Sequence, residues 1–318
     1  MTPMKRRTFL SLMGTTFAAG CAAPALVTRN EKDPFEGGIG GTGIVGLMTD
    51  FGSLIVNGLR VEITSGTRFE TPFGEGSESD VQVGAPLTIA ASLSRDRLVA
   101  RHVLVSYPLV GRVQAIGHGR FSVNGAPIIT EPGGQGRLTH GTRVAVGGVW
   151  SPEGLVASRI DASDEPRDLI AGVVSRGGPT GLLIEGTPMR LNDGNFAPPS
   201  GQYVTAIGDY DGRIFNAATT RTGRFTSGAV GFRQLSVEGY LEPVRANPGF
   251  RIAGLGHSFA REVKLAPLAA ERAIYFGRYT GAFRAAKGYI VPENFGRRRE
   301  ILRNGLGTGY DGPIIRTL

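Results

Sequence analysis

The 318-residue chain contains few of the residue types that build disulfides, metal sites or catalytic centres. It has one cysteine, one tryptophan and four histidines. A single cysteine forms no internal disulfide, which excludes a disulfide-stapled fold. The histidines lack the short spacings of a zinc motif, such as HxH or HxxxH, and are His102, His118, His140 and His257. We therefore expect no metal ion and no cofactor.

Motifs for nucleophilic catalysis and phosphate binding are also missing. No GxSxG sequence occurs, and the glycine-rich segments 37–43 and 133–136 lack the strand-to-helix context of a phosphate loop. Two weaker interpretations stay open. His118 and His140 fall in one predicted unit and could share a metal with a carboxylate. The sequence DYDG at 209–212 resembles the start of a calcium loop without its distal glutamate, and it also suits a tight turn.

Four glutamates surround one loop in the first third of the chain: Glu62, Glu70, Glu75 and Glu78. Carboxylate pairs for glycoside hydrolysis converge in space rather than in sequence, so the spacing does not exclude such a pair. Charged loop residues are more often simply solvated. We expect no catalytic residue and favour a protein that is not an enzyme.

Glycine is the residue that the chain has in excess, with 49 in 318 residues, against an ordinary share of about 7%. The glycines interrupt short runs of valine, isoleucine, leucine and phenylalanine. This pattern is typical of many short strands joined by tight turns. No segment after the N-terminal twenty residues has sustained helical periodicity, although Pro267–Arg272 could form a turn or two. The sequence predicts an all-β fold.

One pattern occurs four times, with a glycine in its first apolar strand at positions 46, 111, 172 and 239. A polar bend, a second apolar strand and a residue–glycine turn follow each time. The four turns are Asn57-Gly58, Asn124-Gly125, Glu185-Gly186 and Ala253-Gly254. Asn-Gly is a strong hairpin signal, because a type I′ turn needs positive φ at both central residues. The chain is thus predicted to contain four copies of one unit.

The second half of each copy adds further strands, giving about five in roughly 60 residues. Closure into a small barrel removes the exposed edges, and the OB type is one such barrel. We predict a tandem array of four small OB-like barrels after a signal peptide and a flexible tether. The predicted segments are a signal peptide at 1–20, a tether at 21–40, units at 41–106, 107–165, 166–224 and 225–296, and a basic tail at 297–318.

The N-terminus has the form of an export signal, with a basic start and a short apolar stretch. Arg6 and Arg7, followed by Phe9 and Leu10, resemble the twin-arginine signal. An ordinary secretory signal with two incidental arginines is the alternative.

Cys21 ends the sequence Ala-Ala-Gly-Cys, which resembles the lipid-attachment site of bacterial lipoproteins. Acyl chains on its sulfur would anchor the chain to a membrane. The alternative is cleavage at Ala23-Pro24-Ala25 without a lipid. Ala22 stands where an aspartate would tend to retain a lipoprotein at the inner membrane, so we expect the periplasmic face of the outer membrane.

The net charge of +8 comes almost entirely from arginine. The arginines are scattered except for Arg297-Arg298-Arg299, whereas a nucleic-acid-binding surface needs clustering. We expect no nucleic-acid partner. A weaker ligand-binding candidate is the group of Tyr275, Tyr279 and Arg278, because aromatic side chains on barrel strands can stack on sugars or bases.

The run GGIGGTGIVGLMTDFGSLIVNG from Gly37, together with the repeated Val-Asn-Gly hairpins, resembles the bacterial domain of unknown function 5666 family. The resemblance spans about residues 37–290 and is closest in the first two units. It implies an exported, often lipid-anchored, β-rich repeat protein, and it implies no activity. We expect a binding or structural module whose partner is an envelope protein or a glycan. The alternatives are an oligosaccharide-binding OB-like protein and an envelope enzyme with a site between units.

Overall fold

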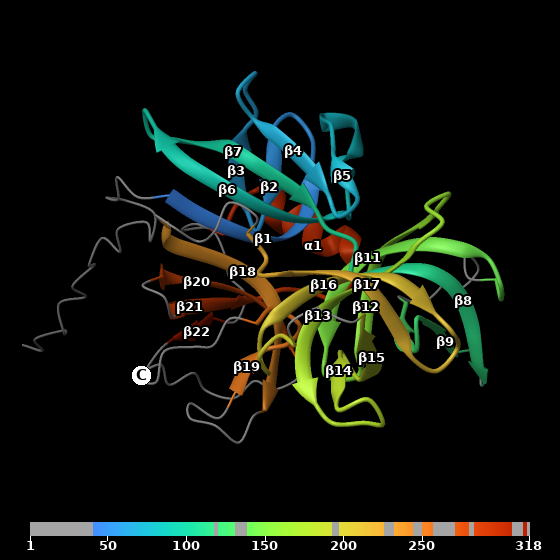
Figure 1. Ribbon diagram of the computed structural model, residues 1–318. Helices are drawn as coiled ribbons and strands as arrows, with labels where there is room; N and C mark the ends of the chain where they lie inside the picture. Colours follow the sequence, from blue (N-terminus) through green and yellow to red (C-terminus); the bar gives the residue numbers. More distant parts are fainter. Residues whose placement is uncertain are drawn as a thin grey trace, which may run out of the picture. The chain divides into compact units, whose positions relative to one another are not determined.

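A computed structural model describes residues 41–117, 120–130, 139–192, 197–225, 232–243, 250–256, 271–279, 283–306 and 314–316. Strands are the main secondary structure of the described chain, which has one α-helix and one short 3-10 helix (Figure 1). The predicted all-β class is therefore confirmed. The export signal with Arg6, Arg7, Phe9 and Leu10, the tether and Cys21 all lie outside the described residues.

The first five-stranded barrel is built from hairpins of the first predicted unit. Its strands are β1 (Gly41–Asp50), β2 (Leu54–Val56), β3 (Leu59–Glu62), β6 (Pro86–Ser94) and β7 (Arg97–Val105). Pairing runs β1-β2-β3-β7-β6 and returns to β1, with β3 and β7 parallel and the other pairs antiparallel. The remaining elements here are β4 (Arg68–Thr71), β5 (Gly74–Glu75) and the 3-10 helix η1 (Glu78–Asp80). Closure leaves no free edge among the five barrel strands.

The second and third barrels repeat this strand order. The second contains β8 (Leu109–Gly117), β9 (Arg120–Val123), β10 (Ala126–Ile129), β11 (Arg143–Ser151) and β12 (Gly154–Ala162). The third contains β13 (Asp168–Arg176), β14 (Leu182–Ile184), β15 (Thr187–Leu191), β16 (Tyr203–Tyr210) and β17 (Phe215–Thr222). In each, the third strand is parallel to the fifth, and the fourth pairs with the first.

The fourth region does not close in the part of the chain that the structure describes, so four tandem barrels are not confirmed. Its elements are β18 (Phe232–Pro243), β19 (Phe250–Ile252), β20 (Arg272–Tyr279), β21 (Phe283–Ile290), α1 (Phe295–Arg303) and β22 (Ile314–Arg316). Here β18 pairs in parallel with β1 of the first barrel, and β22 from the C-terminal segment extends β21. Strand edges that a barrel would pair internally are paired with other parts of the chain.

The helix α1 is an element that the sequence analysis did not predict. Its N-cap is Asn294, whose side chain accepts a hydrogen bond from the backbone N–H of Arg297. The buried positions of the helix are Arg298 and Leu302. An arginine on the buried face interrupts the apolar periodicity that would reveal a helix.

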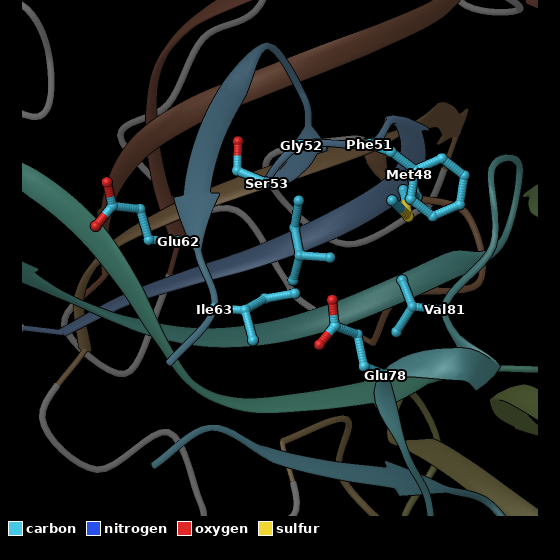
Figure 2. A pocket seen from close by; sticks show the side chains of 9 residues that line it. Met48, Phe51, Gly52, Ser53, Glu62, Ile63, Glu78 and Val81 are labelled. Carbon is cyan, nitrogen blue, oxygen red and sulfur yellow. The ribbon is translucent and has the colours of Figure 1, made fainter. Parts of the chain in front are cut away.

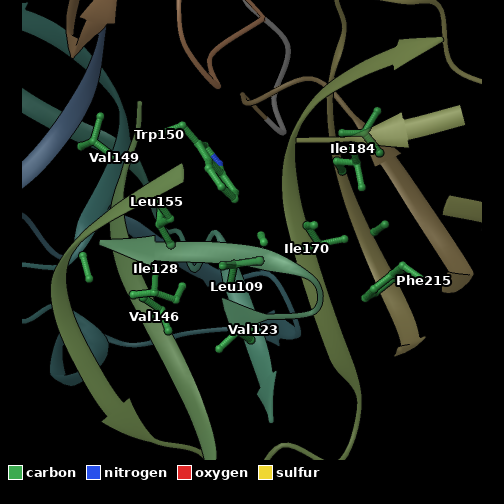
Figure 3. Close-up of a cluster of buried hydrophobic side chains, with 14 of the residues drawn as sticks. Leu109, Val123, Ile128, Val146, Val149, Trp150, Leu155, Ile170, Ile184 and Phe215 are labelled. Atoms are coloured by element: carbon green, nitrogen blue, oxygen red, sulfur yellow. The ribbon is translucent and has the colours of Figure 1, made fainter. Parts of the chain in front are cut away.

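Strand pairing between units does not follow their order along the chain, because the first barrel pairs with the fourth region. The first joins the fourth region through β1 and β18, and the second joins the third through Val110 and Leu169 of β8 and β13. The hydrophobic core of the second and third barrels is one continuous cluster, and Figure 3 shows Trp150 beside residues of both, such as Leu155 and Ile170. Packing between units supplies core that a unit of about 60 residues lacks alone.

Two buried asparagines explain the glycine that recurs in the first strand of the first and second units. Asn57 and Asn124 sit at positive φ in their hairpin turns and fold their side chains back over that strand. A Cβ on Gly46 would overlap the side chain of Asn57, and one on Gly111 would overlap that of Asn124. The recurrent glycine is therefore required for the close approach of the turn residue.

Candidate functional site

A pocket of about 500 Å³ lies at one end of the first barrel (Figure 2). It forms where β1 ends, where the loop 51–53 connects β1 to β2, and where η1 approaches. The nine lining residues are Met48, Phe51, Gly52, Ser53, Leu54, Glu62, Ile63, Glu78 and Val81. We call this cavity the first-barrel pocket.

The pocket has an apolar floor and an exposed aromatic rim. Met48, Leu54 and Val81 are buried members of the first-barrel core. Phe51 lies in the β1–β2 loop with 61% of its surface exposed, the largest exposure of any large hydrophobic residue in the described chain. A single exposed phenylalanine is common on a protein surface, but beside an apolar floor its ring can cover the apolar face of a ligand.

Two carboxylates and one hydroxyl supply the polar groups of the pocket. An oxygen of Glu62 lies 2.9 Å from Nη1 of Arg97, and both side chains are well exposed. Ser53 Oγ accepts a hydrogen bond from Nη1 of Arg60 at 3.0 Å. In Figure 2 the carboxylate of Glu78 points toward Ile63, whereas that of Glu62 lies at the opposite side.

The local structure of η1 fixes the backbone at Glu78, whose side chain is exposed. Ser77 precedes this 3-10 helix, and its backbone N–H donates to Oδ2 of Asp80 at 2.7 Å. The side chain of Glu78 makes no ion pair with any residue that the structure describes. The pocket therefore presents one carboxylate without a positive partner and one whose partner is at the surface.

The arrangement suits binding of a small molecule with an apolar face and several hydrogen-bond donors. The phenylalanine ring and the floor can cover the apolar face, and the carboxylates can accept hydrogen bonds. Across the described ranges, no group of three or more histidine, cysteine, aspartate or glutamate side chains could hold a metal ion.

The aromatic candidates of the sequence analysis do not form one exposed surface. Tyr275 is fully buried in a cluster with residues of β1 and β18, so it offers no face to a ligand. Arg278 is exposed and Tyr279 is partly buried. Phe276 is also buried, because α1 covers the other face of β20. With the helix unpredicted, the sequence could not show that both faces of this strand are covered.

The glutamates named from the sequence separate into different environments. Glu62 and Glu78 line the first-barrel pocket, whereas Glu70 lies between His102 and Arg221, 2.9 Å and 3.0 Å from their nitrogens. Glu75 is exposed in β5.

The sequence analysis did not identify Phe51 as a pocket residue. The only signal in the sequence was an aromatic residue in a turn beside a predicted hairpin.

The weaker metal interpretations receive no support from the described residues. His118 lies outside them, and Nδ1 of His140 accepts a hydrogen bond from the backbone of Ala115 at 3.3 Å. Oδ1 of Asp211 accepts from the backbone N–H groups of Arg213 and Ile214, both at 2.8 Å. The interpretation of Asp211 as a turn-forming residue is confirmed.

A charged cluster outside the first-barrel pocket is buried and has a structural role. Oε1 of Glu238 accepts from Nε of Arg272 at 2.8 Å and lies 3.5 Å from Nε of Arg298, while Oε2 accepts from the backbone N–H of Leu47. Burial alone would raise the pKa of Glu238, but the two guanidinium groups hold it below its usual value. The cluster connects β18, β20 and α1 to the first barrel.

Comparison with known families supports the resemblance noted in the sequence. The model of the family described as domain of unknown function (DUF5666) matches residues 42–103 and 110–161, which include the strands of the first and second barrels. No curated protein and no solved structure matches the chain. No helix in the described ranges is long and apolar enough to cross a membrane.

Proposed function

We propose that this protein is a non-enzymatic binding module of the bacterial cell envelope, and that the first-barrel pocket binds a short oligosaccharide. The observation that carries this proposal is an exposed Phe51 beside an apolar floor and two carboxylates. An aromatic ring covers the C–H face of a sugar, while carboxylates accept hydrogen bonds from its hydroxyl groups.

The strand order supports this choice of ligand. Five strands paired in the order 1-2-3-5-4, with the third parallel to the fifth, correspond to the OB-like barrel expected from the sequence. Barrels of this type bind oligonucleotides and oligosaccharides on the face of their second and third strands, and through the loops that join strands one to two and four to five. In this chain the loop that joins strands one and two carries Phe51. The two carboxylates would repel a phosphate backbone, which favours a sugar over a nucleic acid.

Titration of the purified protein with envelope oligosaccharides by isothermal calorimetry tests this proposal. We expect Phe51→Ala to weaken binding by about tenfold or more, because aromatic stacking contributes roughly 1–3 kcal/mol. Ile116→Ala is the matched control, since Ile116 is also an exposed apolar residue but lies on the second barrel, away from the pocket. Equal affinities of the wild-type protein and Phe51→Ala would contradict the proposal, and shortened sugar chains after incubation would favour an enzyme instead.

We also propose that the chain is exported by its twin-arginine signal and anchored by a lipid on Cys21, with the periplasmic face of the outer membrane as its location. The solitary cysteine and the signal before it support this anchor. Mass spectrometry of the mature protein should find an acylated N-terminal cysteine, and Cys21→Ser should release the protein from membranes. A free thiol on the membrane-associated protein would refute the anchor.

A further inference from the structure

We infer that the oligosaccharide bound by the first-barrel pocket carries a protonated amine, as an amino sugar without its acetyl group does. This inference rests on the proposed function of the pocket and adds the chemical class of its ligand. It follows from the charges at the pocket, from the surroundings of Glu78 and from the position of Phe51.

The pocket is acidic although the chain as a whole is basic. Two of its nine lining residues, Glu62 and Glu78, are carboxylates, and none is lysine or arginine. The net charge of the whole chain is +8. A pocket whose charge opposes that of the protein favours a cationic ligand over a neutral one.

The arginines that contact the pocket residues Ser53 and Glu62 do not pair with Glu78. Arg60 directs its Nη1 to Ser53 Oγ, and Arg97 directs its Nη1 to Glu62. Neither forms an ion pair with Glu78. The pair between Arg97 and Glu62 is exposed, and exposed ion pairs contribute little stability, so a ligand ammonium group can compete for Glu62 as well.

An ammonium group gains more from these residues than a hydroxyl or an acetamide does. Hydrogen bonds from an ammonium to a carboxylate are roughly twice as strong as those between neutral groups. The exposed face of Phe51 adds a cation–π interaction that a neutral sugar does not make. The apolar floor still covers the ring of the sugar, which keeps the site specific for a sugar amine rather than for any cation.

A matched pair of oligosaccharides tests the inference directly. Tetramers of β-1,4-linked glucosamine and of N-acetylglucosamine share a backbone and differ in the amine. At about pH 5.5 amino sugars are largely protonated and ordinary glutamates stay ionised. At low salt we expect the glucosamine tetramer to bind about tenfold more tightly to the wild-type protein, and we expect this preference to decrease as salt screens the charges.

The variant Glu78→Gln should lose most of the preference for the amine. Glu75→Gln is the matched control, because Glu75 is an exposed glutamate of β5 that does not line the pocket, and it should behave as the wild type. Equal binding of the two tetramers, or an unchanged preference in Glu78→Gln, would overturn this inference while leaving the proposed function intact. Binding of no oligosaccharide at all would refute the proposed function and this inference with it.

Discussion

The turn residue of each hairpin does most to define the repeat at the scale of single residues. Nδ2 of Asn124 donates to the backbone oxygens of Val110 and Leu169, at 3.0 and 2.8 Å. Nδ2 of Asn57 donates to the oxygen of Val45 and to Ser236 Oγ. In both cases one bond holds the hairpin to its own first strand and the other reaches the neighbouring unit.

In the third barrel, Glu185 stands at the turn position that an asparagine occupies in the first two barrels. The backbone oxygen of Ala171, which corresponds to that of Val110, accepts a hydrogen bond from Nε1 of Trp150 at 2.8 Å. A turn amide is therefore not needed as a donor there. Glu185 instead accepts a hydrogen bond from the backbone N–H of Val173. The oxygen of Ala171 already accepts a hydrogen bond, whereas the N–H of Val173 needs an acceptor. A glutamate, which accepts, therefore replaces the asparagine, which donates.

A small substitution at the repeat glycine should be costly. We expect Gly111→Ala to lower the free energy of unfolding by about 2 kcal/mol, because the new methyl group overlaps Asn124. Urea denaturation followed by circular dichroism measures the change. Gly66→Ala is the control, since a Cβ there meets only one atom, Oγ1 of Thr64 at 3.8 Å. Equal stability of the two variants would show that the turn side chain does not need the glycine.

At the scale of elements, the hairpin of β14 and β15 carries a titratable group with an unusual proton affinity. Burial raises the pKa of Glu185 to about 7, and the carboxylate of Glu242 adds to the rise. The hydrogen bond from Val173 and the charges of Arg251 and Arg224 act in the opposite direction. The folded state therefore binds this proton more tightly than the unfolded state, whose glutamate has the ordinary value of 4.5.

This difference predicts a pH-dependent stability. The contribution of Glu185 is fully present below about pH 4.5 and is lost as the pH rises through about 7. Between about pH 5 and pH 8, wild-type protein should lose on the order of 2 kcal/mol relative to Glu185→Gln, measured by urea denaturation. Glu153→Gln, at an exposed turn, should keep the wild-type profile. Parallel profiles of the wild type and Glu185→Gln would contradict this assignment.

The buried ion cluster determines how α1 and β20 attach to β18. Glu238→Gln should lower the free energy of unfolding by about 3–5 kcal/mol, because it leaves the guanidinium groups of Arg272 and Arg298 buried without their carboxylate. Glu300→Gln, on the exposed face of α1, should change stability by about 0.5 kcal/mol or less. Thermal unfolding compares the two variants. A Glu238→Gln protein as stable as the control would mean that the cluster does not hold these elements.

At the scale of the whole molecule, the single tryptophan connects three units. Trp150 belongs to β11 of the second barrel, donates to Ala171 of the third, and packs against Gly254 of the fourth region. Tryptophan fluorescence therefore reports on the contacts between units. We expect its unfolding transition to coincide with the loss of β-sheet circular dichroism, because the second and third barrels share one core that Leu47 of the first barrel and Tyr240 and Ala253 of the fourth region also join. Two separate transitions would show that the units unfold independently.

A glycine substitution tests this junction more directly. Gly254 has a φ of +65°, and a Cβ there would overlap the ring of Trp150. We expect Gly254→Ala to reduce stability by about 2 kcal/mol or more and to shift the tryptophan emission to the red. Gly212→Ala is the control, since Gly212 has a φ of +98° and no neighbour within 4 Å of a new Cβ. The control reports backbone strain alone, so identical effects in both variants would exclude a role for the packing.

The sequence by itself determined the local features of this protein. Alternating apolar residues specify strands because side chains on a strand point to opposite faces in turn, and residues such as Asn57 and Asn124 specify hairpins because they tolerate positive φ. The spacing of the repeat glycines is also read from the sequence, and the residues of the first two units carry the resemblance to the matched family. The unit boundaries and the Cys21 anchor stay predictions.

Only the tertiary structure decided what depends on residues far apart in the chain. It decided that β18 pairs with β1, that α1 covers β20, and that Tyr275 is buried. It also brought Phe51, Glu62 and Glu78 to one pocket. Local spacing carries no information about such contacts, because they form when strand edges and apolar faces left over by one unit are covered by another.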